Sequence, residues 1–176
     1  VSVGIHGIIT VLAFADVLAG NSSPLLALSY SASFAVSGVA FAVFMRSRNS
    51  GEKQTAKAGA VSAIMGATEP AMYALIKPDK KRFALCCAGG ALGGATAGFF
   101  GISMHAYAGM GITGLFGFFQ TGDVKLVGVL LMAVLPFGFT WLIEMLLYRQ
   151  EKAVESEEII VMPVNGSVEQ LENAED

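Results

Sequence analysis

The run Gly66-Ala67-Thr68-Glu69-Pro70 decides how this chain folds, because it places a carboxylate between two helix-breaking residues inside an apolar stretch. A charged group at membrane depth is costly and is rarely found there without a polar partner or a substrate. Glycine and proline beside it indicate that the chain is not a plain spanning helix at this point. We therefore expect residues 66–70 to form an irregular, polar feature inside a membrane.

The composition is that of an integral membrane protein. Of the 176 residues, 54% are hydrophobic and only 14% are charged, whereas a soluble domain usually carries about 25% charged residues. The segments Pro24–Met45 and Leu126–Tyr148 are long enough for a spanning helix, which needs roughly 20 residues, and another candidate is a glycine-rich stretch that begins at Phe83. We expect an all-α membrane protein with three to four spanning helices, a re-entrant hairpin and a short β segment at the C-terminus.

The basic residues cluster, and their clusters predict an orientation. All but Lys125 of the 11 lysines and arginines fall within residues 46–57, 77–82 and 149–152. Lysine and arginine prefer cytoplasmic loops, so these three patches are expected on the cytoplasmic side. The segment Ala58–Ile76 then has cytoplasmic flanks at both of its ends.

A segment that leaves and re-enters on one side cannot be a single span. We therefore expect Ala58–Ile76 to dip into the membrane and turn back, with Gly66 and Pro70 at the turn and Glu69 at its tip. Re-entrant backbone is tolerated where protein or a water-filled cavity satisfies its polar groups. Charge counting thus predicts that Glu69 faces a polar cavity.

Several other motifs have simpler interpretations. Glu144 is expected to reach the lipid headgroups or to pair with Arg149. The glycines of residues 89–94 favour close helix packing. The pattern Gly109-x-Gly111-x-x-Gly114 matches a dinucleotide fingerprint, but no strand precedes it. Cys86 and Cys87 are too few for a disulfide framework or a metal site. No cofactor or metal is expected, and no aromatic-interleaved basic patch indicates nucleic acid.

The composition changes after the last apolar stretch. Residues 151–158 form an acidic stretch that is expected to be a solvated cytoplasmic linker. Residues 159–168 read as a short strand, a turn and the start of a second strand. We therefore divide the chain into a membrane domain at 1–150, the linker, and the truncated start of a soluble domain at 159–176.

These motifs together resemble a known family. Residues 66–73, Gly-Ala-Thr-Glu-Pro-Ala-Met-Tyr, resemble the Gly-Ile-Thr-Glu-Pro-Ala-Ile-Tyr signature of enzyme IIC, the membrane component of the bacterial sugar phosphotransferase system. The match is to its β-glucoside, sucrose and trehalose branch. Lys81-Arg82-Phe83 with the glycines of 89–95 resembles a later stretch of that family, and Gly4-Ile5-His6 its Gly-Leu-His element. Residues 162–168 are similar to the opening of a glucose-type enzyme IIA domain.

The resemblance implies a function for the complete protein. It would take up a sugar and release it as a phosphate ester, the phosphoryl group coming from a phosphocysteine on a IIB domain. Glu69 and His6 would act at the sugar hydroxyls, with Thr68, Gly66 and Pro70 completing the binding site. The phosphocysteine and the phosphohistidine of IIA would lie outside this chain, so the chain alone is not assigned an enzymatic activity.

The resemblance also implies partners and a location. The partners would be the sugar, the IIB and IIA domains, the general phosphocarrier protein, the lipid bilayer and a second copy of the full-length protein. The protein would be a multi-pass protein of the bacterial inner membrane with a cytoplasmic tail. From the residues alone two alternatives stay open: an ion-coupled secondary transporter with Glu69 as its coupling site, and a non-catalytic assembly subunit or remnant.

Overall fold

The computed structural model describes residues 5–118 and 126–147, and these form a helical bundle. Its elements are the helices α1 (Ile5–Leu18), α2 (Pro24–Arg46), α3 (Ser50–Ile64), α4 (Glu69–Ala71), α5 (Lys80–Phe100) and α6 (Leu126–Leu147), a π-helical segment η1 (Met72–Ile76) and a 3-10 segment η2 (Gly111–Phe118). The part of the chain that the structure describes contains no named strand. The expected strands at 159–168 lie outside the described residues.

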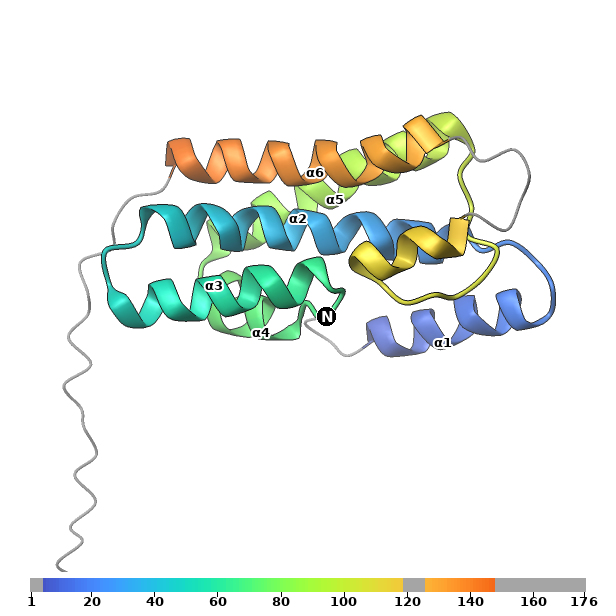
Figure 1. Cartoon of the computed structure of the whole chain (residues 1–176), viewed down its shortest axis with the longest axis horizontal. Coiled ribbons are helices and arrows are strands. Elements are labelled where there is room, and N and C mark those ends of the chain that lie inside the picture. Colours follow the sequence, from blue (N-terminus) through green and yellow to red (C-terminus); the bar gives the residue numbers. More distant parts are fainter. Residues whose placement is uncertain (1–4, 119–125, 148–176) are drawn as a thin grey trace, which may run out of the picture.

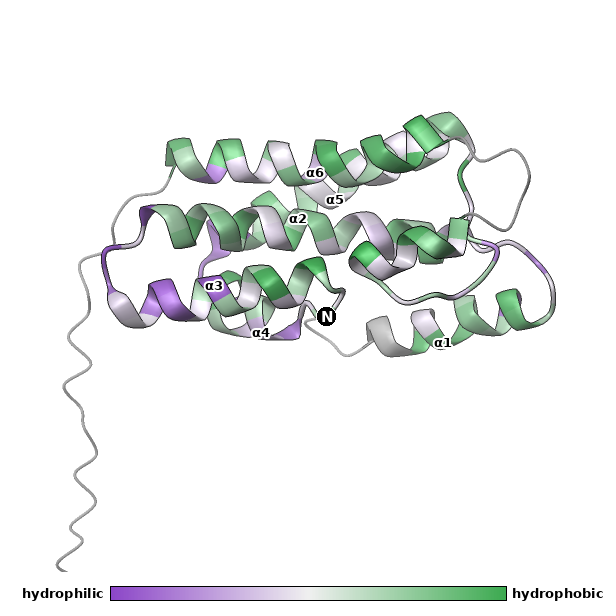
Figure 2. Cartoon of the chain, in the orientation of Figure 1, coloured by the Kyte–Doolittle hydropathy of each residue, from purple (hydrophilic) through white to green (hydrophobic). Residues whose placement is uncertain are grey.

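Three of these helices, α2, α5 and α6, are long and apolar enough to cross a membrane. Figure 2 shows hydrophobic residues along most of α6 and α2, and hydrophilic ones at the end where α2 stops and α3 begins. The three predicted spans are therefore confirmed as helices. At 14 residues, α1 is shorter than the roughly 20 that a span needs.

The helix ends follow from local sequence. Pro24 opens α2, where its missing N–H has no helical partner to lose. The side chains of Asn49 and Asp79 accept hydrogen bonds from the backbone N–H groups of Gly51 and Lys81, at 2.9 and 2.8 Å, and so cap α3 and α5. Gly101, with φ of 58°, ends α5 in the left-handed conformation that glycine adopts without strain.

Helix α2 is the centre of the bundle, with α5 and α6 on one side and α3, α4 and η2 on the other (Figure 1). Small residues let the spans approach closely. Gly38 of α2 lies against Thr140 of α6, and Gly89 and Gly93 of α5 lie against the same face of α6. The hydroxyl of Thr140 reaches the carbonyl oxygen of Ala35 at 3.0 Å. The close packing predicted for the glycines of residues 89–94 is confirmed at Gly89 and Gly93, whereas a Cβ on Gly90 would meet nothing within 4 Å.

The basic residues of the described part gather at one end of the bundle. Arg46 closes α2, and Arg82 in the first turn of α5 contacts both Glu52 near the start of α3 and Glu144 near the end of α6. The helix ends that carry the first two basic patches therefore meet at one end. This arrangement is the one that the charge pattern predicts.

Candidate functional site

The segment that carries the Thr-Glu-Pro motif is a helical hairpin, which we call the Glu69 hairpin, residues 50–76. Its first arm is α3 and its return arm is α4 continued by η1, and the two arms pack together. The reversal predicted within Ala58–Ile76 is confirmed, but the first arm begins at Ser50, eight residues before the predicted start. Residues 50–57 read as a loop because they are polar, yet the Asn49 cap starts a helix there.

The turn between the arms is formed by residues 65–68. Gly66 has φ of +104°, a conformation that is strained for any residue with a Cβ. The backbone N–H of Gly66 bonds the carbonyl of Ala63 at 3.0 Å, and that of Ala67 bonds the carbonyl of Ser62 at 2.9 Å. Thr68 is the N-cap residue of the return arm and Glu69 is its first helical residue. The short motif therefore makes the turn and places Glu69 at the tip.

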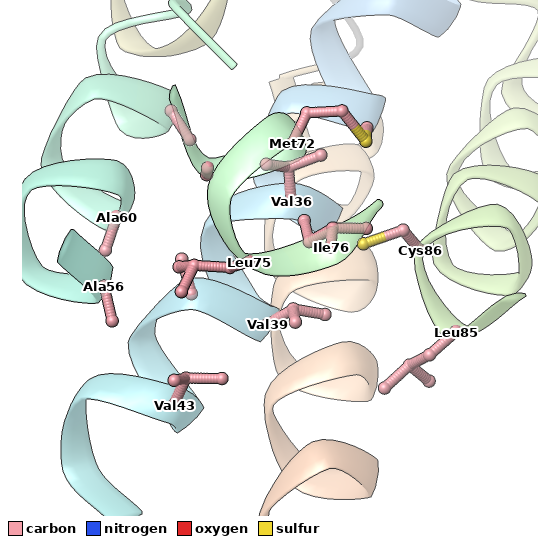
Figure 3. Packing of buried hydrophobic residues seen from close by; sticks show 13 residues of the cluster. Val36, Val39, Val43, Ala56, Ala60, Met72, Leu75, Ile76, Leu85 and Cys86 are labelled. Atoms are coloured by element: carbon pink, nitrogen blue, oxygen red, sulfur yellow. The ribbon is translucent and has the colours of Figure 1, made fainter. Parts of the chain in front are cut away.

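The tip lies near the middle of α2, and hence near mid-depth of the spans. The hydroxyl of Ser37, in α2, donates to the carbonyl oxygen of Ala60 at 3.2 Å. Helix α3 runs antiparallel to α2 and continues four residues beyond Ala60, about 6 Å. Figure 3 shows the inner face of the hairpin, with Met72, Leu75 and Ile76 packed near valines of α2.

A second irregular segment meets the tip from the opposite end of α2. A Cβ on Gly66 would lie 2.5 Å from the carbonyl oxygen of Met110, and one on Gly111 would overlap the carbonyl oxygen of Ile64. The segment η2 that follows packs on the first half of α2, where the rings of Tyr30 and Phe118 are 5.2 Å apart. Two irregular segments thus meet near mid-depth.

Glu69 opens onto a groove along the outer face of the hairpin. The groove is open, has a volume of about 940 Å³, and is lined by Gly51, Gln54, Thr55 and Ala58 from α3 and by Glu69, Pro70, Tyr73 and Ala74 from the return arm. Glu69 is exposed, and within the described residues no side chain forms an ion pair with it. Lys77 lies 5.0 Å above the ring of Tyr73. The groove therefore offers one unpaired carboxylate, an amide, a hydroxyl and an aromatic ring.

The structure brings together four of the five predicted site residues. Gly66, Thr68, Glu69 and Pro70 lie in one turn at the hairpin tip. His6 lies in the first turn of α1, and its side chain is outside the described part of the chain. Its role at the sugar, like the roles of the other four, stays a prediction.

Sequence reasoning missed the partner of Glu144. This residue is buried, and its carboxylate accepts a 3.0 Å hydrogen bond from Nε of Arg82, 62 positions earlier. The expectation that Glu144 reaches the headgroups is therefore wrong, and its partner in the described part of the chain is Arg82. Arg149, the other expected partner, lies outside the described residues. A charge inside a span requires a partner, but choosing between Arg82 and Arg149 needs the crossing of α5 and α6, which no local pattern contains.

Sequence reasoning also gave no role to Gly109 and Gly111. Both have positive φ, 107° and 64°, and Gly111 touches the hairpin tip. The available signal is the glycine pattern at 109–114, because glycines also serve backbone with positive φ and not only nucleotide-binding loops.

The relatives found by comparison with known proteins are all described as components of PTS systems. The chain is 32% identical over 120 residues to the PTS system beta-glucoside-specific EIIBCA component of Halalkalibacterium halodurans, covering 68% of this chain and 19% of the relative. It is 36% identical over 106 residues to the protein of the same description in Bacillus subtilis, covering 60% of this chain and 17% of the relative. It is 31% identical over 125 residues to the PTS system sucrose-specific EIIBC component of Bacillus subtilis, covering 71% of this chain and 24% of the relative.

The chain thus spans about a fifth of the length of these relatives. No family model matches the chain, and no solved structure matches it.

Proposed function

Because this chain belongs to the phosphotransferase-system family of β-glucoside- and sucrose-specific membrane components, we propose that it is the part of a sugar permease that holds the sugar during uptake and phosphorylation. The whole protein would lie in the bacterial inner membrane with its C-terminal tail in the cytoplasm. The relatives are described as fused EIIBC and EIIBCA components, so IIB and IIA domains are the proposed phosphotransfer partners.

One observation carries this proposal: an unpaired carboxylate at the tip of a hairpin that ends near mid-depth of the spans. An ionised carboxylate accepts hydrogen bonds only, and sugar hydroxyls are donors. Hydrogen bonds to a charged acceptor are worth about 1.5–3 kcal/mol. Gln54, Thr55 and the ring of Tyr73 line the same groove and supply the further polar and stacking contacts that a sugar uses.

The proposed chemistry is a phosphoryl transfer in which Glu69 handles the proton. The sugar hydroxyl oxygen attacks the phosphorus of the IIB phosphocysteine, the phosphorus–sulfur bond breaks, and the cysteine leaves as a thiolate. The hydroxyl proton passes to the Glu69 carboxylate, or to the imidazole of His6 if that side chain reaches the sugar. Thr68, Gly66 and Pro70 are proposed to shape the binding site by holding the turn.

The test uses the full-length protein in membrane vesicles with phosphoenolpyruvate and the soluble phosphocarrier proteins. We expect sugar uptake that requires the phosphocarriers and yields a sugar phosphate. Uptake that persists without them and collapses with the proton gradient would refute the proposal in favour of the ion-coupled transporter.

Glu69→Gln is the matching site variant. We expect sugar affinity to fall roughly 10- to 100-fold, because a charged hydrogen-bond acceptor is lost. Asp16→Asn is the control, since it makes the same chemical change at an exposed position in α1. Sugar binding by Glu69→Gln that equals that of Asp16→Asn would contradict the assigned role.

A further inference from the structure

The guanidinium of Arg82 joins elements that are far apart in the sequence. Its Nε donates to Glu144 of α6 at 3.0 Å, and its Nη2 contacts Glu52 of α3 at 3.3 Å. Its Nη1 donates to the carbonyl oxygen of Leu75 in η1 at 3.3 Å, and Asp79 lies 3.6 Å from Nε. One side chain therefore contacts both arms of the Glu69 hairpin and a spanning helix, while its own backbone belongs to another span.

The geometry suits arginine in particular. A guanidinium is planar and presents five N–H donors in a fixed fork, which lysine does not. The arginine side chain is only 14% exposed and that of Glu144 only 6%. On the hairpin side, the hydroxyl of Ser47 donates to the second oxygen of Glu52 at 2.7 Å and so orients this carboxylate toward Arg82.

Removing this side chain would do more than delete contacts. Glu52, Asp79 and Glu144 surround the one guanidinium. Without it, a buried carboxylate on α6 would remain uncompensated and would repel the two other carboxylates. This repulsion would act between Glu52 at the start of the hairpin and Glu144 of the spanning helix α6.

The contact at Leu75 links this cluster to the candidate sugar site. Leu75 lies in η1, which continues from α4, the short helix that begins with Glu69. Leu75 is six positions after Glu69 along the return arm, about 9 Å at the rise of an α-helix. A shift of the return arm at Leu75 therefore displaces Glu69 as well.

We propose that Arg82 is a positioning residue of the sugar site, which fixes the Glu69 hairpin to α5 and α6 so that Glu69 stays at its place near mid-depth. It does not touch the sugar. The proposal rests on the proposed function for its sugar-binding readout, while the anchoring of the hairpin can be measured without any sugar.

Two neighbouring cysteines of α5 can report whether the Glu69 hairpin is anchored. Cys86 is buried in the cluster that includes Ile76 of the hairpin, and Figure 3 shows the two side chains side by side. Its neighbour Cys87 is exposed. A hairpin that leaves α5 uncovers Cys86 and leaves Cys87 unchanged, so the ratio of their alkylation rates reports the position of the hairpin.

The experiment compares Arg82→Gln, Arg82→Lys and the control Lys81→Gln in the full-length protein. Lys81 is the exposed neighbour of Arg82, so its variant removes the same charge outside the cluster. Alkylation by N-ethylmaleimide is followed residue by residue with mass spectrometry, and sugar affinity is measured on the same samples. If the hairpin is in place only a tenth of the time, sugar affinity falls about tenfold.

We expect Arg82→Gln to raise the Cys86-to-Cys87 rate ratio and to weaken sugar binding about tenfold or more. In both the rate ratio and the sugar affinity, Arg82→Lys should lie between Arg82→Gln and the wild type, and Lys81→Gln should equal the wild type. Should Arg82→Gln fold poorly, the double variant Arg82→Gln/Glu144→Gln removes the uncompensated carboxylate. It should restore the yield of folded protein but not the sugar affinity, because the Leu75 contact is still missing.

Two results would overturn the inference. An unchanged Cys86 ratio in Arg82→Gln shows that the hairpin is not anchored there. A raised ratio with wild-type sugar affinity shows that the anchor is structural and does not position the site. If the wild-type protein itself binds no sugar, the proposed function fails, and the Cys86 ratio alone then decides whether Arg82 anchors the hairpin.

Discussion

The contact between Gly66 and Met110 leads to a prediction with a matched control in the same chain. Gly66 has φ of +104° and Gly20 has φ of +81°, so alanine is strained at both positions. The two differ in their surroundings. A Cβ at position 20 meets nothing within 4 Å, whereas one at position 66 lies 2.5 Å from the carbonyl oxygen of Met110 and 2.7 Å from its Cβ.

The expected losses in the free energy of unfolding follow from two contributions, the positive φ and the contacts of the added methyl. A non-glycine residue at positive φ costs on the order of 1–3 kcal/mol, and this applies to Gly20→Ala and to Gly66→Ala alike. Forcing an added methyl into a packed position costs a further 1–3 kcal/mol or so, which applies only to Gly66→Ala. The difference between the two variants isolates the contact of the hairpin tip with Met110.

The assay is unfolding of the full-length protein in detergent, with both variants compared at one protein concentration. We expect the free energy of unfolding to fall about 1–3 kcal/mol further for Gly66→Ala than for Gly20→Ala. Equal losses in the two variants would refute the argument, since they would mean that the tip does not meet the 109–111 segment as closely as the structure has it.

Two further predictions concern the packing around α2 and use the same unfolding measurement. Gly38→Ala places a methyl on the hydroxyl of Thr140 and should lower the free energy of unfolding by about 1–3 kcal/mol. In the control Gly90→Ala the new methyl meets nothing within 4 Å, so the free energy of unfolding should not fall. Equal effects of the two variants would argue against the close approach of α2 and α6. Ser37→Ala removes the hydrogen bond to the hairpin and should cost about 1 kcal/mol. The control Ser29→Ala removes a bond within its own helix, and a larger loss in that control would contradict the assigned contact.

Sequence patterns predicted the elements whose causes are local. The spans around α2, α5 and α6 follow from runs of apolar residues, and the hairpin follows from basic flanks on both sides of the Gly-Ala-Thr-Glu-Pro turn. The start of α3 was predicted too late, because a polar first turn looks like a loop until the Asn49 cap is taken into account.

What the sequence by itself determined is therefore a membrane-spanning helical protein with a turn at Gly66 and a carboxylate at Glu69. The tertiary structure decided three things: that Arg82 pairs with Glu144, that Gly111 meets the hairpin tip, and that the tip ends near the middle of α2. The physical reason is sequence separation. Apolar runs and helix breakers act through neighbouring residues, whereas an ion pair between α5 and α6 exists only after the helices have packed.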